Sequence, residues 1–221
     1  MATPKSQRIG IWIIAIVMVV GTLLSFVVMV LSSKNDMTDQ ARIQQLSSDY
    51  QKDYADYQKK VDAQAKDLSD KYYDSFKQYK DDAAKFDKSD VKSLKKNDLK
   101  TGDGAKLTEK STFTAYYIGW TPDGEVFDSS FDGKKLKAPI NVTPGGVIKG
   151  WTEGVDGMKV GGVRELTIPS DKAYGKAGSG DKIPADTPLK FIIMVIPAPK
   201  EIKEPAVPKE LLEYYQQNSV Q

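Results

Sequence analysis

The chain has 221 residues and a formal net charge of +2, which gives no electrostatic argument for nucleic acid as a partner. It contains neither cysteine nor histidine, so disulfides, thiol catalysis, a serine-protease triad and Cys- or His-based metal sites are excluded. Its carboxylates lack the spacing of a metal-binding loop, and we predict no metal and no other cofactor. Any enzymatic chemistry must therefore depend on carboxylates, Tyr, Lys and the shape of the binding site.

The first candidate element runs from Ile9 to Leu31, which carries no charge. As a helix, this segment would reach about 34 Å, enough to cross a bilayer core of about 30 Å. A cleaved signal peptide is the alternative, but its apolar run is usually shorter, about 7–15 residues. We therefore predict an uncleaved transmembrane anchor at residues 9–31.

The charges around this segment predict its orientation. Lys5 and Arg8 precede it, whereas only Lys34 follows closely. Because cytoplasmic flanks carry the excess of Lys and Arg, residues 1–8 should form a cytoplasmic tail. We expect a single-pass protein of the cell membrane with the rest of the chain on the exported side.

The next segment predicts one long helix from Asp36 to about Phe86. No Gly or Pro occurs between Thr22 and Thr101. Apolar or aromatic residues recur in steps of 3, 4 and 4, an 11-residue period that keeps a stripe on one face. The stripe comprises Ile43, Leu46, Tyr50, Tyr54, Tyr57, Val61, Ala65, Leu68, Tyr72, Phe76, Tyr79 and Ala83. Two interpretations stay open: a solvated stalk that leans on its own domain, or a helix that self-associates or contacts clients.

The second half of the chain is rich in turns and predicts strands. Fifteen of the 17 glycines lie between Gly102 and Gly180. Thr112–Tyr117 and Val163–Ile168 alternate, Asp123-Gly124 is a hairpin-turn dipeptide, and Leu189–Ile196 reads as a central strand. This pattern predicts an α+β domain in which a curved antiparallel sheet wraps one short helix.

The segment Val147–Met158 supplies that helix. Trp151, Val155 and Met158 fall at i, i+4 and i+7, on one helical face. Glycines in the segment mark positions where another layer must come close. A Trp that simply fills the core is the alternative to a Trp that faces a binding site.

After Ile196, four prolines predict an extended tail: Pro197, Pro199, Pro205 and Pro208. Leu211–Gln217 could form two helical turns opened by Pro208. We expect a flexible tail.

Several motifs occur in an order that is specific as a set: Tyr117-Ile118-Gly119, Phe127-Asp128-Ser129-Ser130, Val147-Ile148-Lys149-Gly150-Trp151, Ala173-Tyr174-Gly175, Ile183-Pro184 and a last strand with Phe191. This arrangement resembles the FKBP-type peptidyl-prolyl isomerase family from about Lys88 to Ala198. The resulting division is a tail (1–8), an anchor (9–31), a helical stalk (32–87), an FKBP-type isomerase domain (88–198) and a Pro-rich tail with a short helical stretch (199–221).

The resemblance implies a hydrophobic cup for a proline ring. Trp151 would be its floor, with walls from Tyr117, Phe127, Val147, Ile148 and Phe191, and Ile183 on a flap. The N–H of Ile148 and the hydroxyl of Tyr174 would bind substrate carbonyls, and Asp128 would accept a hydrogen bond from Tyr117. The implied catalytic residues are thus Tyr117, Asp128 and Tyr174.

Two departures from the family pattern stand out. The segment 133–141 is one residue longer and lacks an aromatic, for which Leu136, Ala138 and Ile140 are the candidate replacements. Ser179 and Lys182 occupy flap positions where the family often has bulkier or apolar groups. We expect a less apolar rim to weaken substrate and macrolide affinity more than it changes the fold.

Rotation about a prolyl bond makes and breaks no covalent bond, so a chain without His and Cys is not handicapped for it. We expect a membrane-anchored isomerase and folding helper for exported proline-containing polypeptides, which macrolides of the family would inhibit. The alternative is a non-catalytic membrane-tethered module that binds a partner on the same fold.

Overall fold

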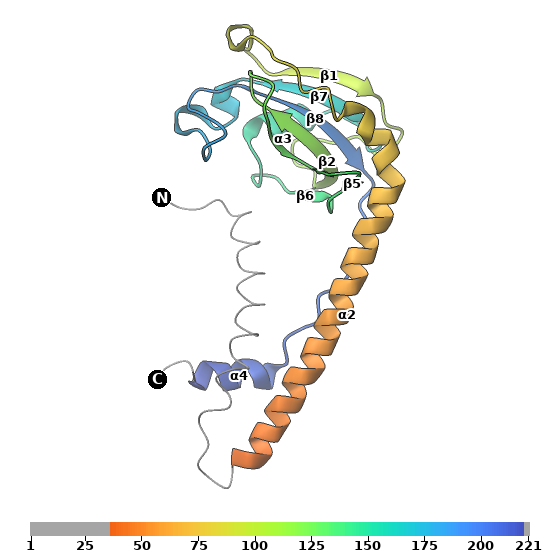
Figure 1. The fold of residues 1–221 in the computed structure, drawn as a ribbon, viewed down its shortest axis with the longest axis vertical. Helices are drawn as coiled ribbons and strands as arrows, with labels where there is room; N and C mark the ends of the chain where they lie inside the picture. Colours follow the sequence, from red (N-terminus) through yellow and green to blue (C-terminus); the bar gives the residue numbers. More distant parts are fainter. Residues whose placement is uncertain (1–35, 219–221) are drawn as a thin grey trace. The chain divides into compact units, whose positions relative to one another are not determined.

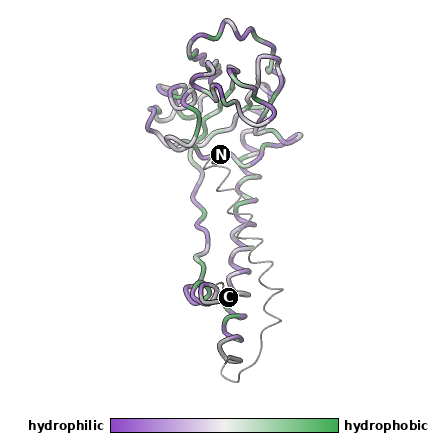
Figure 2. The backbone as a smooth tube through the Cα atoms, turned by 90° about the vertical axis from the view of Figure 1, so that its left-hand side faces the viewer, coloured by the Kyte–Doolittle hydropathy of each residue, from purple (hydrophilic) through white to green (hydrophobic). Residues whose placement is uncertain are grey.

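The computed structural model describes residues 36–218, which form two compact units. One unit comprises Asp62–Glu201, and the other comprises residues 36–61 with 202–218. Within 36–218, no helix combines the length and apolar character that a bilayer crossing requires. Figure 2 shows that hydrophilic and hydrophobic residues are interspersed along the longest helix, α2 (Asp36–Phe76). The anchor predicted at residues 9–31 lies outside the described residues.

The larger unit contains an antiparallel sheet in the order β1-β7-β8-β2-β3, with β6 also paired to β2 (Figure 1). Its strands are β1 (Lys95–Lys100), β2 (Phe113–Trp120), β3 (Val126–Ser129), β6 (Ile140–Val142), β7 (Val163–Ile168) and β8 (Leu189–Ile196). A separate hairpin pairs β4 (Phe131–Asp132) with β5 (Lys135–Leu136). The predicted turn at Asp123-Gly124 joins β2 to β3, and Gly124 has a positive φ of 79°. The predicted sheet of antiparallel strands around one short helix is confirmed.

The short helix α3 (Lys149–Val155) lies against β7. A Cβ atom at Gly150 would overlap the side chain of Ile168, and one at Gly154 would overlap Leu166. The two glycines, one helical turn apart, therefore allow the closest approach of helix and sheet. The helix ends at Val155, so Met158 lies beyond it, although Met158 is buried in the same core.

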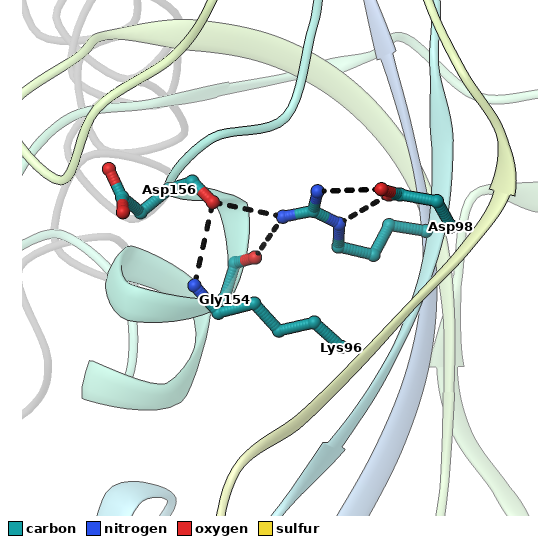
Figure 3. Close-up of polar contacts among 5 residues, drawn as sticks. Lys96, Asp98, Gly154 and Asp156 are labelled. Carbon is teal, nitrogen blue, oxygen red and sulfur yellow. Dashed lines mark hydrogen bonds and ion pairs between the residues drawn. The ribbon is translucent and has the colours of Figure 1, made fainter.

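A buried arginine ties the end of α3 to the sheet (Figure 3). Arg164 on β7 donates to Asp98 Oδ1 at 2.6 Å and Oδ2 at 3.1 Å, and its Nη1 donates to the carbonyls of Gly154 (2.8 Å) and Asp156 (3.1 Å). These carbonyls are at the C-terminal end of the helix, where the partial negative charge of its dipole lies. Arg164 thus provides hydrogen-bond donors for the carbonyl groups at the end of α3, and it fixes α3 relative to β1 and β7.

A second core covers the opposite face of the sheet. Tyr116, Ile118 and Trp120 alternate along β2 with residues of the first core, so β2 is buried on both faces. The second core contains Phe76, Tyr116, Ile118, Trp120, Leu136, Val163, Ile192, Met194 and Ile196, with Leu68, Tyr72, Tyr73, Tyr79, Ala83, Phe86 and Phe131 packed against it. The last turns of α2 therefore belong to the packing of the larger unit.

The long helix ends at Phe76, ten residues before the predicted end at Phe86. A 3-10 turn, η1 (Lys77–Tyr79), follows, and the chain then runs irregularly along the sheet. Its carbonyl at Ala84 accepts from the indole N–H of Trp120 (3.0 Å), and Phe86 N donates to the carbonyl of Pro122 (3.0 Å). These tertiary contacts end the helix without a Gly or Pro signal. The stripe from Leu68 to Ala83 leans on its own domain, as one of the two interpretations expected.

The smaller unit contains the helix α4 (Lys209–Asn218), whose Leu211 is buried. Arg42 forms a two-pronged ion pair with Glu210, with both distances 2.7 Å. The pKa of Tyr50 is raised mainly by burial and to a smaller extent by the negative charge of Glu204. The C-terminal segment is thus packed against the beginning of α2, and the helical alternative for residues 211–217 is the one that forms.

Phe76→Ala should lower the free energy of unfolding by about 3–5 kcal/mol, because the Phe76 ring is fully buried and stacks on Phe131 with centroids 5.1 Å apart. Urea unfolding of the full chain, followed by circular dichroism, measures the change. Asp67→Ala on the exposed side of the same helix is the control and should stay within about 0.5 kcal/mol. Equal midpoints for the two variants would show that α2 is dispensable for the domain.

Candidate active site

Four aromatic rings form a continuous edge-to-face chain on the α3 side of the sheet. The centroid of Trp151 lies 5.3 Å from that of Tyr117 and 5.3 Å from that of Phe191, with interplanar angles of 81° and 88°. Phe127 continues the chain, 5.5 Å from Phe191 at 84°. Edge-to-face contacts of this kind fix ring positions as well as burying area. The rings therefore form a preorganised apolar surface.

Gly119 makes this chain possible, because it lies on β2 directly beneath two of the rings. A Cβ atom there would be 2.5 Å from Phe191 Cε1 and 2.7 Å from Phe127 Cζ. Any side chain would therefore displace one of the rings. The sequence motif Tyr117-Ile118-Gly119 contains this residue, but its spacing gives no reason for the glycine.

The remaining predicted binding residues join the same core. Ile183 is 4% exposed, as is Phe191, and Trp151 is 3% exposed, so these three form the interior of the site. Tyr117, Phe127, Val147 and Ile148 are half-buried and pack around that interior. The structure thus brings together all six predicted binding residues and Tyr117, with the indole as a covered floor and the half-buried side chains as the accessible wall.

Two hydrogen-bond donors at the site have no partner among the described residues. The first is the backbone N–H of Ile148, which lies just before α3 with extended dihedrals (φ −59°, ψ 150°), while its carbonyl accepts from Trp151 N at 3.0 Å. The second is the hydroxyl of Tyr174, a residue that is 38% exposed. Unpaired donors beside an apolar wall are suited to bind the carbonyl groups of a peptide.

Asp128 interacts with both of the tyrosines predicted to act with it. The Tyr117 hydroxyl donates to Asp128 Oδ2, and Asp128 Oδ1 accepts from Ser129 N at 2.8 Å. Burial, together with this hydrogen bond, raises the pKa of Tyr117 well above its usual range. Burial and the charge of Asp128 also raise the pKa of Tyr174. Tyr117, Asp128 and Tyr174 therefore form one electrostatically linked group in which both hydroxyls keep their protons.

Further supporting contacts were not predicted from the sequence. Ser130 Oγ accepts from Tyr117 N at 2.9 Å, which fixes the backbone of the first tyrosine. Lys172 forms an ion pair with Glu153 on α3, and this contact lowers the pKa of Glu153. The pair joins the floor helix to the segment that leads into Tyr174. Residues 19 positions apart meet here only because of the fold, so no local pattern could have identified them.

The structure distinguishes between the three candidates for the missing aromatic. Leu136 is buried in the second core, on the opposite face of the sheet, and Ala138 is exposed. Ile140 on β6 packs against the core that contains Trp151. Leu136 is therefore a wrong candidate, and Ile140 is the one of the three that packs beside the predicted binding residues.

The geometry is suited to binding and orienting a peptide rather than to transferring groups. Among residues 36–218, no three Asp or Glu side chains gather into a group that could hold a metal ion. What the site offers is an apolar surface, two unpaired donors and one carboxylate held by a tyrosine.

Comparison with known proteins identifies the family of this chain. The family model of the FKBP-type peptidyl-prolyl cis-trans isomerase matches residues 103–196. The FK506-binding protein of Neisseria meningitidis serogroup A is 42% identical over 106 residues, which cover 47% of this chain and 94% of that protein. A probable FK506-binding protein of Corynebacterium glutamicum is 44% identical over 104 residues, 46% of this chain and 84% of that protein.

Among solved structures, a peptidyl-prolyl cis-trans isomerase from Pseudomonas syringae pv. tomato is 36% identical, with a TM-score of 0.43, and the match covers 48% of this chain and 76% of that one. The identity to the meningococcal protein extends over nearly its whole length. This chain therefore belongs to the FKBP-type peptidyl-prolyl cis-trans isomerase family.

Proposed function

We propose that this protein catalyses cis–trans isomerisation of prolyl bonds in proline-containing polypeptides at the site around Trp151. The observation that carries the proposal is the pair of unpaired donors, Ile148 N–H and Tyr174 Oη, beside a wall of half-buried apolar side chains. A proline ring packed on this wall would place the neighbouring carbonyl groups within reach of the donors. No cofactor takes part.

The chemistry requires only that the site binds the twisted amide better than the planar one. Rotation of a prolyl amide faces a barrier of roughly 18–20 kcal/mol because resonance is lost. The twisted carbonyl carries less negative charge than the planar one, so an apolar site penalises it less. The two donors would hold the flanking peptide while the amide turns. Asp128 would keep the Tyr117 hydroxyl in place at the edge of the cup.

Two relatives are named FK506-binding proteins. Their names support the proposal that a macrolide of this kind occupies the same cup and competes with substrate. We further propose that the clients are exported polypeptides and that residues 9–31 anchor the protein in the cell membrane, with the isomerase domain outside. The uncharged run between Ile9 and Leu31, preceded by Lys5 and Arg8, supports this placement. Self-association through α2 stays a prediction.

A non-catalytic binding module on the same fold is the alternative function. Asp128→Asn and Tyr117→Phe separate the two, because each removes one side of the tyrosine–carboxylate contact. We expect each to lower kcat/KM for a proline tetrapeptide roughly ten-fold, the equivalent of one charge-assisted hydrogen bond. The full chain is assayed, with thermal unfolding as a check of folding.

Asp132→Asn, on an exposed side chain of β4, is the matched control and should leave the rate unchanged. A wild-type protein that binds proline peptides without accelerating their isomerisation would establish the alternative.

The activity should vary less than about two-fold between pH 6 and 9. The chain has no histidine, and the raised pKa values of Tyr117 and Tyr174 keep both hydroxyls protonated throughout this range. Because folding raises these pKa values, their contribution to stability is complete below about pH 10 and is lost as the pH rises further. A pH–rate profile tests this, and a sigmoidal step near neutrality would show that another group acts in catalysis.

The proposed location predicts that the full chain stays in the membrane pellet after alkaline carbonate extraction of cells that produce it. Protease added on the outer side of the cell membrane should digest the isomerase domain, because that domain would lie on the exported side. Release into the soluble fraction would contradict the anchor, and protection from protease would contradict the orientation.

A further inference from the structure

Two lysine side chains reach the backbone of β3 at the edge of the cup. Lys182, on the flap that precedes Ile183, places Nζ 3.3 Å from the carbonyl oxygen of Phe127. Lys137, which follows β5, places Nζ 2.9 Å from the carbonyl oxygen of Ser129. These carbonyls belong to the residues on each side of Asp128 in the sequence. Two ammonium groups thus flank the strand that carries a wall residue and the site carboxylate.

Neither ammonium group has a carboxylate within 4.0 Å among residues 36–218, and both side chains are exposed. Two other lysines near the site, Lys149 and Lys172, differ in this respect because both pair with Glu153. A carbonyl oxygen orients an ammonium group but does not neutralise its charge. Lys137 and Lys182 therefore present uncompensated positive charge at the rim.

The acidic groups closest in sequence do not cancel this charge. Asp128 already accepts from the Tyr117 hydroxyl and Ser129 N. Asp181 precedes Lys182 but is exposed and forms no ion pair with it. Lys182 also occupies a flap position where the family often has a bulkier or apolar group. A charged residue at such a position changes which peptides the rim can accept.

We propose that Lys137 and Lys182 determine specificity, so that the cup favours prolyl bonds with an acidic residue directly before or after the proline. This inference rests on the proposed function of the cup as a prolyl-peptide site. An Asp or Glu side chain beside a bound proline would meet the two ammonium groups at the rim. A basic residue in the same place would be repelled.

The expected effect is modest, because exposed charge pairs contribute little and are screened by salt. At low ionic strength, a Glu-Pro peptide should have about three-fold higher kcat/KM than its Gln-Pro counterpart, and a Lys-Pro peptide should be the poorest. The Glu/Gln ratio should approach one at roughly 1 M salt, where the Debye length is only about 3 Å. A hydrophobic Leu-Pro peptide should show little dependence on salt.

The test uses the full chain and two peptide series, one with Glu, Gln, Lys or Leu before proline and one with these residues after it. Lys182→Met, Lys137→Met and the double variant keep a long side chain but remove the charge. Lys134→Met is the matched control, because Lys134 is exposed in the turn between β4 and β5 and its side chain forms no hydrogen bond with β3 among the described residues. Peptide dissociation constants, obtained by titration, accompany each rate.

We expect the Glu/Gln ratio to fall toward one in the double variant and to stay at the wild-type value in Lys134→Met. Equal kcat/KM and equal affinity for Glu and Gln peptides in both series would overturn the inference, as would a preference that survives in the double variant. These results differ from a failure of the proposed function, in which the Leu-Pro peptide also shows no acceleration. In that case, the dissociation constants alone decide whether the rim prefers acidic peptides.

Discussion

Burial of the central strands on both faces is the constraint on which the isomerase domain depends. Along β2, alternate side chains enter two different cores, one with Trp151 and the other with Phe76. The first core builds the cup, and the second holds the sheet that the cup rests on. The end of α2 and the segment that follows it cover this second face, so without them its apolar side chains would be exposed to water.

The proposed activity of the cup depends on the fixed positions of its side chains, not on a chemically reactive group. Glycines at three points remove side chains that would push the layers apart: Gly150 and Gly154 on α3, where it faces the sheet, and Gly119 under the rings. Arg164 then fixes the far end of the helix through its carbonyl groups. A site that must distinguish a planar amide from a twisted one depends on such fixed positions, because it has no nucleophile or proton shuttle to compensate for a loose fit.

The sequence predicts β2, β7, β8 and the turn at Asp123-Gly124, because local alternation, an apolar run and a turn dipeptide mark them. The grouping of the cup residues follows only from the family resemblance of their motifs. The sequence does not predict the end of α2 at Phe76, where tertiary contacts rather than Gly or Pro stop the helix. The ion pair between Glu153 and Lys172 and the hydrogen bond from Lys182 to Phe127 could not be predicted from the sequence either. Both join segments that meet only after folding. Leu136 shows the same limit: its spacing suited the cup, but its strand faces the other core.

The two described tryptophans lie in different cores, Trp151 in the cup and Trp120 beneath the segment after α2, with its indole N–H on the carbonyl of Ala84. Intrinsic fluorescence can therefore report on each face of the sheet separately once Trp12 and the other of these two indoles are replaced by phenylalanine. Emission from Trp151 would change when a ligand occupies the cup. Emission from Trp120 would change when the end of α2 and the segment after it separate from the sheet. Coincident unfolding curves from the two probes would mean that both layers melt as one cooperative unit.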